Sequence, residues 1–140
     1  MSKIDRIFVD TSTFVALFNE RDEMHYEAIR LLEEIKNKRI RLVVTDYILS
    51  ESITTTLARA SHKAAVTVGE FILGSHVIDL IWLDKPFKFK AWEFFKKHSD
   101  KSYFFIDCTS FIVMKEMKVN HYFAFDEDFV KTGFIDFASK

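Results

Sequence analysis

Two kinds of hydrophobic pattern alternate along this chain. Short apolar runs of the length of buried strands occupy residues 4–9, 41–45, 77–83 and 121–125. Elsewhere apolar positions recur every three or four residues, as in Met24, Ala28, Leu31, Leu32 and Ile35, with charged residues between them. That spacing is typical of helices that bury one face. The pattern predicts a helix that follows a polar turn at residues 10–13, and further helices over residues 24–35, 47–60, 62–73, 86–97 and 107–118.

Strands that alternate with helices predict an α/β fold with a central parallel sheet. The chain holds only three Gly and one Pro, and no flexible linker or repeat interrupts the pattern. We therefore predict a single domain over residues 1–140. Sixteen Phe make its composition unusually aromatic, and most of them are expected to pack in the core.

Four acidic residues stand at unusual places, namely at the ends of apolar runs. Asp10, Asp107 and Asp126 each close such a run, and Glu51 follows Tyr-Ile-Leu-Ser. In parallel α/β sheets, ligands bind beyond the carboxyl ends of the strands. Asp10 and Asp126 fall at predicted strand ends, and Glu51 and Asp107 fall near helix starts that face the same edge. The pattern thus predicts that the four side chains converge.

Converging carboxylates need a counter-charge. Burial disfavours an ionised acid, and neighbouring acids raise one another's pKa. A divalent cation removes that conflict, and oxygen ligands alone favour a hard ion such as Mg²⁺ or Mn²⁺. Such a site is suited to phosphate chemistry, because the ion can activate water and neutralise charge on phosphoryl oxygens.

Each acid also has a purely structural interpretation. Asp10 and Asp107 could cap helices, Glu51 could face solvent, and Asp126 could form a turn. Without a shared site, four acids would have to stand at the ends of apolar runs for four unrelated reasons. We therefore favour a shared site. Two further acids are treated differently. Asp79 lies in the middle of a strand and is expected to face solvent, whereas Asp128 either approaches the metal through water or caps the next segment.

Four segments resemble the motifs of PIN domains, most closely the compact toxin ribonucleases of the VapC type. They are FVDTS at residues 8–12, TDYILSE at 45–51, FIDCTSF at 105–111, and FAFDEDF at 123–129 followed by Gly133-Phe134. Each segment alone is a weak signal. All four in order, over nearly the whole chain, are a strong one.

The resemblance implies a three-layer αβα sandwich and hydrolysis of RNA phosphodiester bonds with Mg²⁺ or Mn²⁺. It assigns catalysis to Asp10, Glu51, Asp107 and Asp126, with Asp10, Asp107 and Asp126 as metal ligands. Supporting roles fall to Thr11, Ser12 and Asp128, where Thr11 or Ser12 supplies a hydroxyl to the first acid. The resemblance also implies a homodimer and an antitoxin protein bound in the cell.

Composition limits the other possibilities. The longest apolar run, from Phe14 to Phe18, is far shorter than the roughly 20 residues that span a bilayer. A lone Cys108 fits a reducing compartment, and we expect a cytoplasmic protein with no membrane contact and no leader. Histidines lack zinc-ligand spacing, and no glycine-rich phosphate loop or serine-hydrolase elbow occurs.

Two classes of function remain open. The first is a metal-dependent ribonuclease, expected to be the toxin of a toxin–antitoxin pair. The second is a PIN-like module that binds RNA or a protein and cuts poorly, which the near-neutral balance of 20 basic and 21 acidic residues also allows. A phosphohydrolase acting on small phosphates would require a narrow, closed pocket.

Overall fold

The computed structural model describes residues 3–138, so the outermost residues of the predicted 1–140 domain lie outside the described part. Its elements follow the order β1 (Arg6–Val9), α1 (Thr11–Phe18), α2 (His25–Asn37), β2 (Arg41–Thr45), α3 (Asp46–Arg59), α4 (His62–Gly74), β3 (Ile78–Ile81), α5 (Lys85–Lys97), α6 (Phe105–Met117), β4 (His121–Phe123) and β5 (Ile135–Asp136). The strands form one sheet in the order β3-β2-β1-β4-β5, and every neighbouring pair is parallel.

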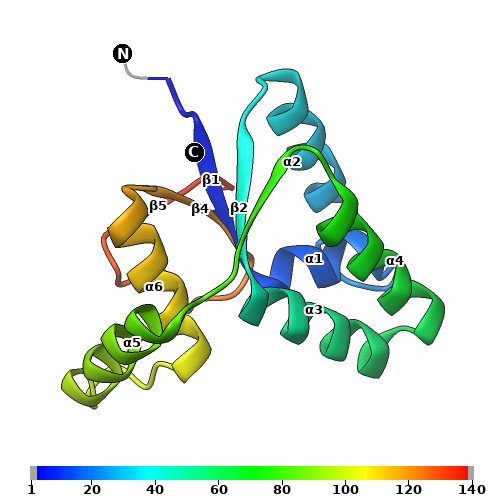
Figure 1. Cartoon of the computed structure of the whole chain (residues 1–140). Coiled ribbons are helices and arrows are strands. Elements are labelled where there is room, and N and C mark those ends of the chain that lie inside the picture. The colour runs from blue at the N-terminus through cyan, green and yellow to red at the C-terminus, as the bar shows by residue number, and fades with distance from the viewer. Residues whose placement is uncertain (1–2, 139–140) are drawn as a thin grey trace.

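Helices cover both faces of this sheet. In Figure 1, α1 to α4 gather on one side of the strands, and α5 and α6 lie together on the other. The central strands are buried on both faces, so they consist of continuous apolar residues instead of an alternating pattern. Phe8 of β1, for example, pairs with Val43 of β2 and Tyr122 of β4. The predicted three-layer αβα sandwich with a central parallel sheet is confirmed.

The core is rich in phenylalanine. All sixteen Phe lie in the described part, and only Phe89, Phe95 and Phe104 are exposed. Phe111 of α6 makes an edge contact with Phe129, with ring centroids 5.1 Å apart, so α6 is tied to the loop that follows β4. The prediction that most Phe are packing residues is confirmed.

The structure corrects several element boundaries. β5 was not predicted, because a strand of only Ile135 and Asp136 leaves no hydrophobic pattern. β3 ends at Ile81 instead of residue 83, since the Leu83 amide donates to Asp46 Oδ1 at 2.9 Å and the chain leaves the sheet there. β4 ends at Phe123 instead of residue 125, because the Phe125 amide donates to the Ser12 hydroxyl.

Asp79 lies on β3, the edge strand of the sheet. Its carboxylate forms an ion pair with Arg41, with 2.6 Å between Nη2 and Oδ1, and β2 separates its strand from β1. The expectation that it faces solvent from an edge strand is confirmed. Among the described residues, no helix is long and apolar enough to cross a membrane.

Helix α3 contains both satisfied and unsatisfied buried hydroxyl groups. The Thr45 hydroxyl, at the helix start, accepts a hydrogen bond from the Ile48 amide at 3.1 Å. Thr56 is also fully buried, yet its hydroxyl finds no hydrogen-bond partner among residues 3–138. A buried hydroxyl without a partner lowers the stability of the folded protein, whereas a hydrogen bond that caps a helix raises it.

We therefore expect opposite outcomes for one substitution at these two positions. Thr45→Val should lower the free energy of unfolding by about 1–2 kcal/mol, because the Ile48 amide loses its acceptor. Thr56→Val should leave it unchanged or raise it by up to about 1 kcal/mol. Urea unfolding of both variants checks this, and equal losses at the two sites would contradict it.

Candidate active site

Asp10 occupies the point where β1 passes into α1. Its amide donates to the Phe123 carbonyl at 3.1 Å, which joins the end of β1 to the end of β4. The Ser12 hydroxyl makes a second link, since it lies 3.4 Å from Asp10 Oδ2 as a donor and accepts from the Phe125 amide at 2.9 Å. Asp10 holds the N-cap position of α1, but its side chain makes no cap hydrogen bond. Its carboxylate therefore contacts the Ser12 hydroxyl and does not cap the helix.

Glu51 is brought next to Thr11 by helix packing. It lies on α3, which begins directly after β2, the neighbour of β1 in the sheet. The Thr11 hydroxyl of α1 donates to Glu51 Oε1 across the interface between the two helices. Ser12 thus contacts Asp10, and Thr11 contacts Glu51. The sequence had left open which of the two hydroxyl groups contacts Asp10.

Asp107 arrives from the opposite helical layer. It lies in the first turn of α6, is only 4 % exposed, and accepts a hydrogen bond from the Phe104 amide at 3.1 Å. Burial raises its pKa to about 7, and the charges of Asp128, Asp126 and Glu51 add to that effect, while the Phe104 amide opposes it. A carboxyl group that titrates near neutrality is typical of functional sites.

The loop after β4 supplies the last two acids. Asp126 is exposed, and its Oδ1 accepts a hydrogen bond from the Asp128 amide at 3.2 Å, so it forms the turn here. Asp128 is half-buried, and its pKa is raised by burial, by the charge of Asp126 and by hydrogen bonding to Asp126. Asp128 also faces Asp107, since each affects the titration of the other.

The acids act on one another as a group. Burial raises the pKa of Asp10 well above its ordinary range, and the charge of Asp126, a hydrogen bond to Asp126 and the charge of Asp107 raise it further. Within residues 3–138, none of the five acids forms an ion pair with a Lys, Arg or His side chain. The structure therefore brings together Asp10, Glu51, Asp107, Asp126 and Asp128 as an acid cluster.

The composition of the acid cluster fits a divalent cation, since it offers only carboxylate oxygens with unbalanced charge. The spacing is looser than the sequence predicted. In the described part of the chain, no three His, Cys, Asp or Glu side chains stand in an arrangement that could hold a metal ion. Asp10 lies within hydrogen-bond reach of Asp126, and Asp128 lies within reach of both Asp126 and Asp107, so the described carboxylates approach one another in pairs without forming a three-ligand group.

Other nucleophiles are poorly placed. Burial, and then the charge of Asp107, raises the pKa of the Cys108 thiol to about 11, so it is not a thiolate at neutral pH. The expectation that Cys108 is a buried hydrophobe is confirmed.

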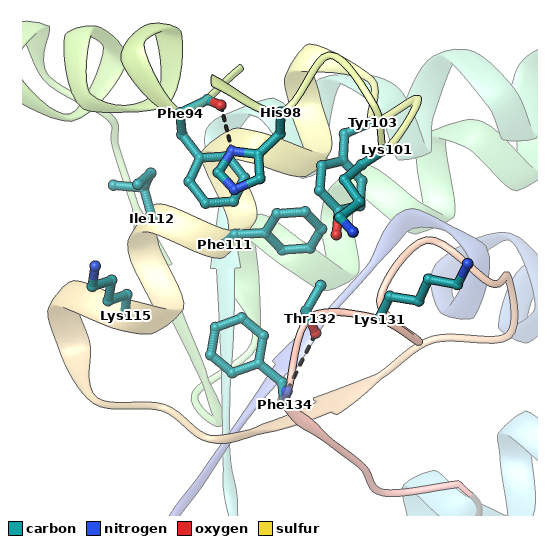
Figure 2. A pocket seen from close by; sticks show the side chains of 10 residues that line it. All are labelled: Phe94, His98, Lys101, Tyr103, Phe111, Ile112, Lys115, Lys131, Thr132 and Phe134. Carbon is teal, nitrogen blue, oxygen red and sulfur yellow. Dashed lines mark hydrogen bonds between the residues drawn. The ribbon is translucent and has the colours of Figure 1, made fainter. Parts of the chain in front are cut away.

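Two of the hollows that border α6 differ in chemistry. One, of about 250 Å³, is lined by aromatic and basic side chains that include His98, Tyr103, Phe111 and Lys115, and by no acid (Figure 2). In it, the His98 ring stacks on Phe94. The second hollow, of about 470 Å³, opens beside the acid cluster.

The lining of this second hollow includes Tyr47, Ser50 and Glu51 from α3 and Ile106 from α6. Tyr47 had not been singled out from the sequence, because one tyrosine on an apolar helix carries no functional signal.

The chain is similar to a known family, to a characterised relative and to a solved structure. The family model described as "PIN domain" matches residues 7–135. The "23S rRNA-specific endonuclease VapC20" of Mycobacterium tuberculosis, found in two strains, is 35% identical over 130 residues, which cover 93% of this chain and 96% of the relative. The crystal structure of that VapC20, titled a sarcin-ricin loop cleaving toxin, matches with a TM-score of 0.84 and 34% identity, covering 92% of this chain and 96% of the other.

The raised pKa of Asp107 predicts a pH-dependent effect of Asp107→Asn. Between pH 3.8 and about pH 7, the Asp107 carboxyl group has lost its proton in the unfolded chain but keeps it in the folded chain. The free energy of unfolding therefore falls as the pH rises through this range. Asparagine removes this penalty and keeps an oxygen for the Phe104 amide. In EDTA, the variant should gain on the order of 1–3 kcal/mol over wild type at pH 8 and almost nothing at pH 4.

Thermal and urea unfolding at both pH values measure the difference between the two proteins. Asp79→Asn is the matched control, because that acid is paired with Arg41 outside the cluster. If Asp107→Asn were less stable than wild type at pH 8, the prediction would be wrong. The Asp107 carboxylate would then be chiefly a structural group.

Proposed function

This chain belongs to the PIN domain family, and on that premise we propose that it is a metal-dependent endoribonuclease. The observation that carries the proposal is the acid cluster, in which buried carboxylates from both helical layers raise one another's pKa with no cationic side chain paired to them. A structural role would not require this electrostatic cost, since the fold could use neutral caps at the same positions.

We assign metal binding to Asp10, Asp107 and Asp126, and Mg²⁺ or Mn²⁺ is the ion that their oxygens favour. When bound, the ion would lower the pKa of a water molecule and offset charge on the phosphoryl oxygens. The chain's own groups supply the geometry. Ser12 positions Asp10, and the Phe104 amide holds Asp107.

Glu51 takes a different role in the proposal. It is held by the Thr11 hydroxyl at the rim of the acid cluster, in the hollow that opens to solvent. We assign it to accepting a proton from the attacking water and to orienting that water. Asp128, which faces both Asp107 and Asp126, supports the cluster from the loop after β4.

The substrate and partners follow from the relatives. VapC20 is an endonuclease specific for 23S rRNA and a toxin, and the similarity spans nearly all of both chains. We propose that this protein is likewise the toxin of a toxin–antitoxin pair, that it acts on RNA in the cytoplasm, and that it forms a homodimer and binds an antitoxin protein.

Two observations favour a second candidate function. Among the described residues the acids are not arranged to hold a metal ion, and several aromatic rings are exposed on α5. A PIN module that binds RNA or a protein without cutting would show both features. The open hollow at the acid cluster argues against a phosphohydrolase for small phosphates, which would need a closed pocket.

The ribonuclease proposal predicts cleavage of single-stranded RNA in Mg²⁺ or Mn²⁺ and none in EDTA. Asp107→Asn removes one anionic oxygen with little change in size and should lower the rate roughly 10²-fold or more. Product length on denaturing gels, followed over time with mixed RNA as substrate, measures the rate. Asp79→Asn should cut like wild type, because that acid lies outside the cluster.

Two outcomes would contradict this proposal in different ways. Equal cleavage in EDTA would eliminate the metal mechanism. Intact RNA in Mn²⁺, together with measurable RNA binding, would favour the binding module.

A further inference from the structure

Exposed aromatic rings concentrate around one helix. The three exposed Phe of the chain, Phe89, Phe95 and Phe104, all lie on α5 or immediately before α6. Trp92 of α5 is 46 % exposed and Phe89 is 55 % exposed. Large rings left in water mark surfaces that bind something. The core already contains the other phenylalanines, so packing within this chain does not account for these.

Two of these rings, Trp92 and Phe95, belong to a continuous row that leads to the acid cluster. Trp92 stacks on Phe95 with ring centroids 5.8 Å apart, and both make edge contacts with Phe105, at 6.5 and 6.1 Å. Phe105 in turn contacts Tyr47 of α3 at 6.3 Å. Tyr47 lines the same hollow as Glu51, and Phe105 precedes Asp107 by two residues. The row therefore ends at the acid cluster.

Lysines lie over the same rings. Lys85 Nζ is 5.8 Å from the centre of the Phe89 ring, and Lys88 Nζ is 5.8 Å from that of Tyr47. Neither lysine forms an ion pair with any residue in the part of the chain that the structure describes. Both line a shallow hollow of about 340 Å³ whose remaining walls are Phe89, Trp92 and Phe105. No acid lines this hollow.

We propose that this surface, the α5 platform of Tyr47, Lys85, Lys88, Phe89, Trp92 and Phe105, holds the unpaired nucleotides that flank the scissile phosphate of an RNA substrate. The proposal rests on the proposed function, and it adds where the RNA lies. Bases stack on aromatic side chains without regard to sequence, and lysines contact the phosphates between them. The platform is the ring-and-lysine surface that leads directly into the acid cluster.

The α5 platform also answers an electrostatic problem. The chain has a formal net charge of -1, and its acid cluster repels a polyanion. Unpaired lysines beside the cluster provide local attraction that the whole molecule lacks. Charge complementarity also favours RNA over a second copy of this chain. In a twofold dimer built on this surface, each copy would place Lys85 and Lys88 against the same patch of its partner.

The test measures binding separately from cutting. Fluorescence anisotropy of a labelled, unstructured 12-nucleotide RNA is followed in EDTA, with Asp107→Asn as the parent protein in every case. Adding Trp92→Ala to this parent should weaken binding about 5- to 100-fold, as the loss of one stacking ring does. Trp92→Phe keeps a ring and should restore most of the affinity. Circular dichroism confirms that each variant is folded.

Loss of a lysine should change the salt dependence of RNA binding. Lys88→Gln should reduce the slope of log affinity against log salt concentration by about 0.7, the contribution of one phosphate contact on a single strand. The matched controls are Tyr26→Ala and Lys63→Gln, which remove a ring that is 79 % exposed on α2 and an exposed lysine on α4. Both controls should bind RNA like the parent. Duplex RNA of the same length should bind more weakly than the single strand, because its bases are not free to stack.

Several results would overturn the α5 platform. One is unchanged RNA affinity in Trp92→Ala. Another is equal binding to single-stranded and duplex RNA. A third is a change of oligomeric state in sedimentation with no change in RNA affinity, which would make this surface an interface between copies. Its failure is separable from that of the ribonuclease proposal, because platform-dependent binding without cleavage in Mn²⁺ would retain the platform and remove the nuclease.

Discussion

The repulsion among carboxylates at one edge of the sheet is the constraint on which the rest of this structure depends. Asp10 and Asp107 are buried against their own preference and against the charges of Asp126 and Asp128. The fold resists this repulsion with groups that do not move easily. A backbone amide holds Asp107, and the Ser12 hydroxyl joins Asp10 to the chain after β4. The acids are therefore positioned by secondary structure and not by long flexible side chains.

The two helical layers differ in how much of the hydrophobic core they share. The layer of α1 to α4 packs into the main core and contributes Glu51, whose position depends on the contact between α1 and α3. The opposite layer is an α5–α6 pair with a small core of its own around Ala91, Cys108 and Ile112. Beside that small core, α5 leaves Phe89, Trp92 and Phe95 partly in water. Its exposed rings lie beside the acid cluster, where a substrate would need support.

The PIN domain match over residues 7–135 spans every acid of the cluster. The motifs that resemble PIN domains are also the places where this chain buries acids at the ends of strands and at the start of a helix. A match of 35% identity would be compatible with lost activity if one of these acids were replaced. Here each of the four expected acids is present; Asp107, Asp126 and Glu51 each raise the pKa of another acid, and the pKa of Asp10 is raised by Asp126 and Asp107. Function is thus argued from the site and not from the fold alone.

The α/β class, the parallel sheet and the acids at the ends of elements could all be predicted from the sequence, because periodic burial and the residues at element ends are local properties that the hydrophobic pattern records. It missed β5, the early ends of β3 and β4, and the partner of Thr11. Those features depend on hydrogen bonds between distant segments, such as Leu83 to Asp46, Phe125 to Ser12, and Thr11 to Glu51. No local pattern predicts such contacts. The spacing of the acids and the row of rings from α5 could not be predicted either, since both are set by how separate helices pack across the sheet.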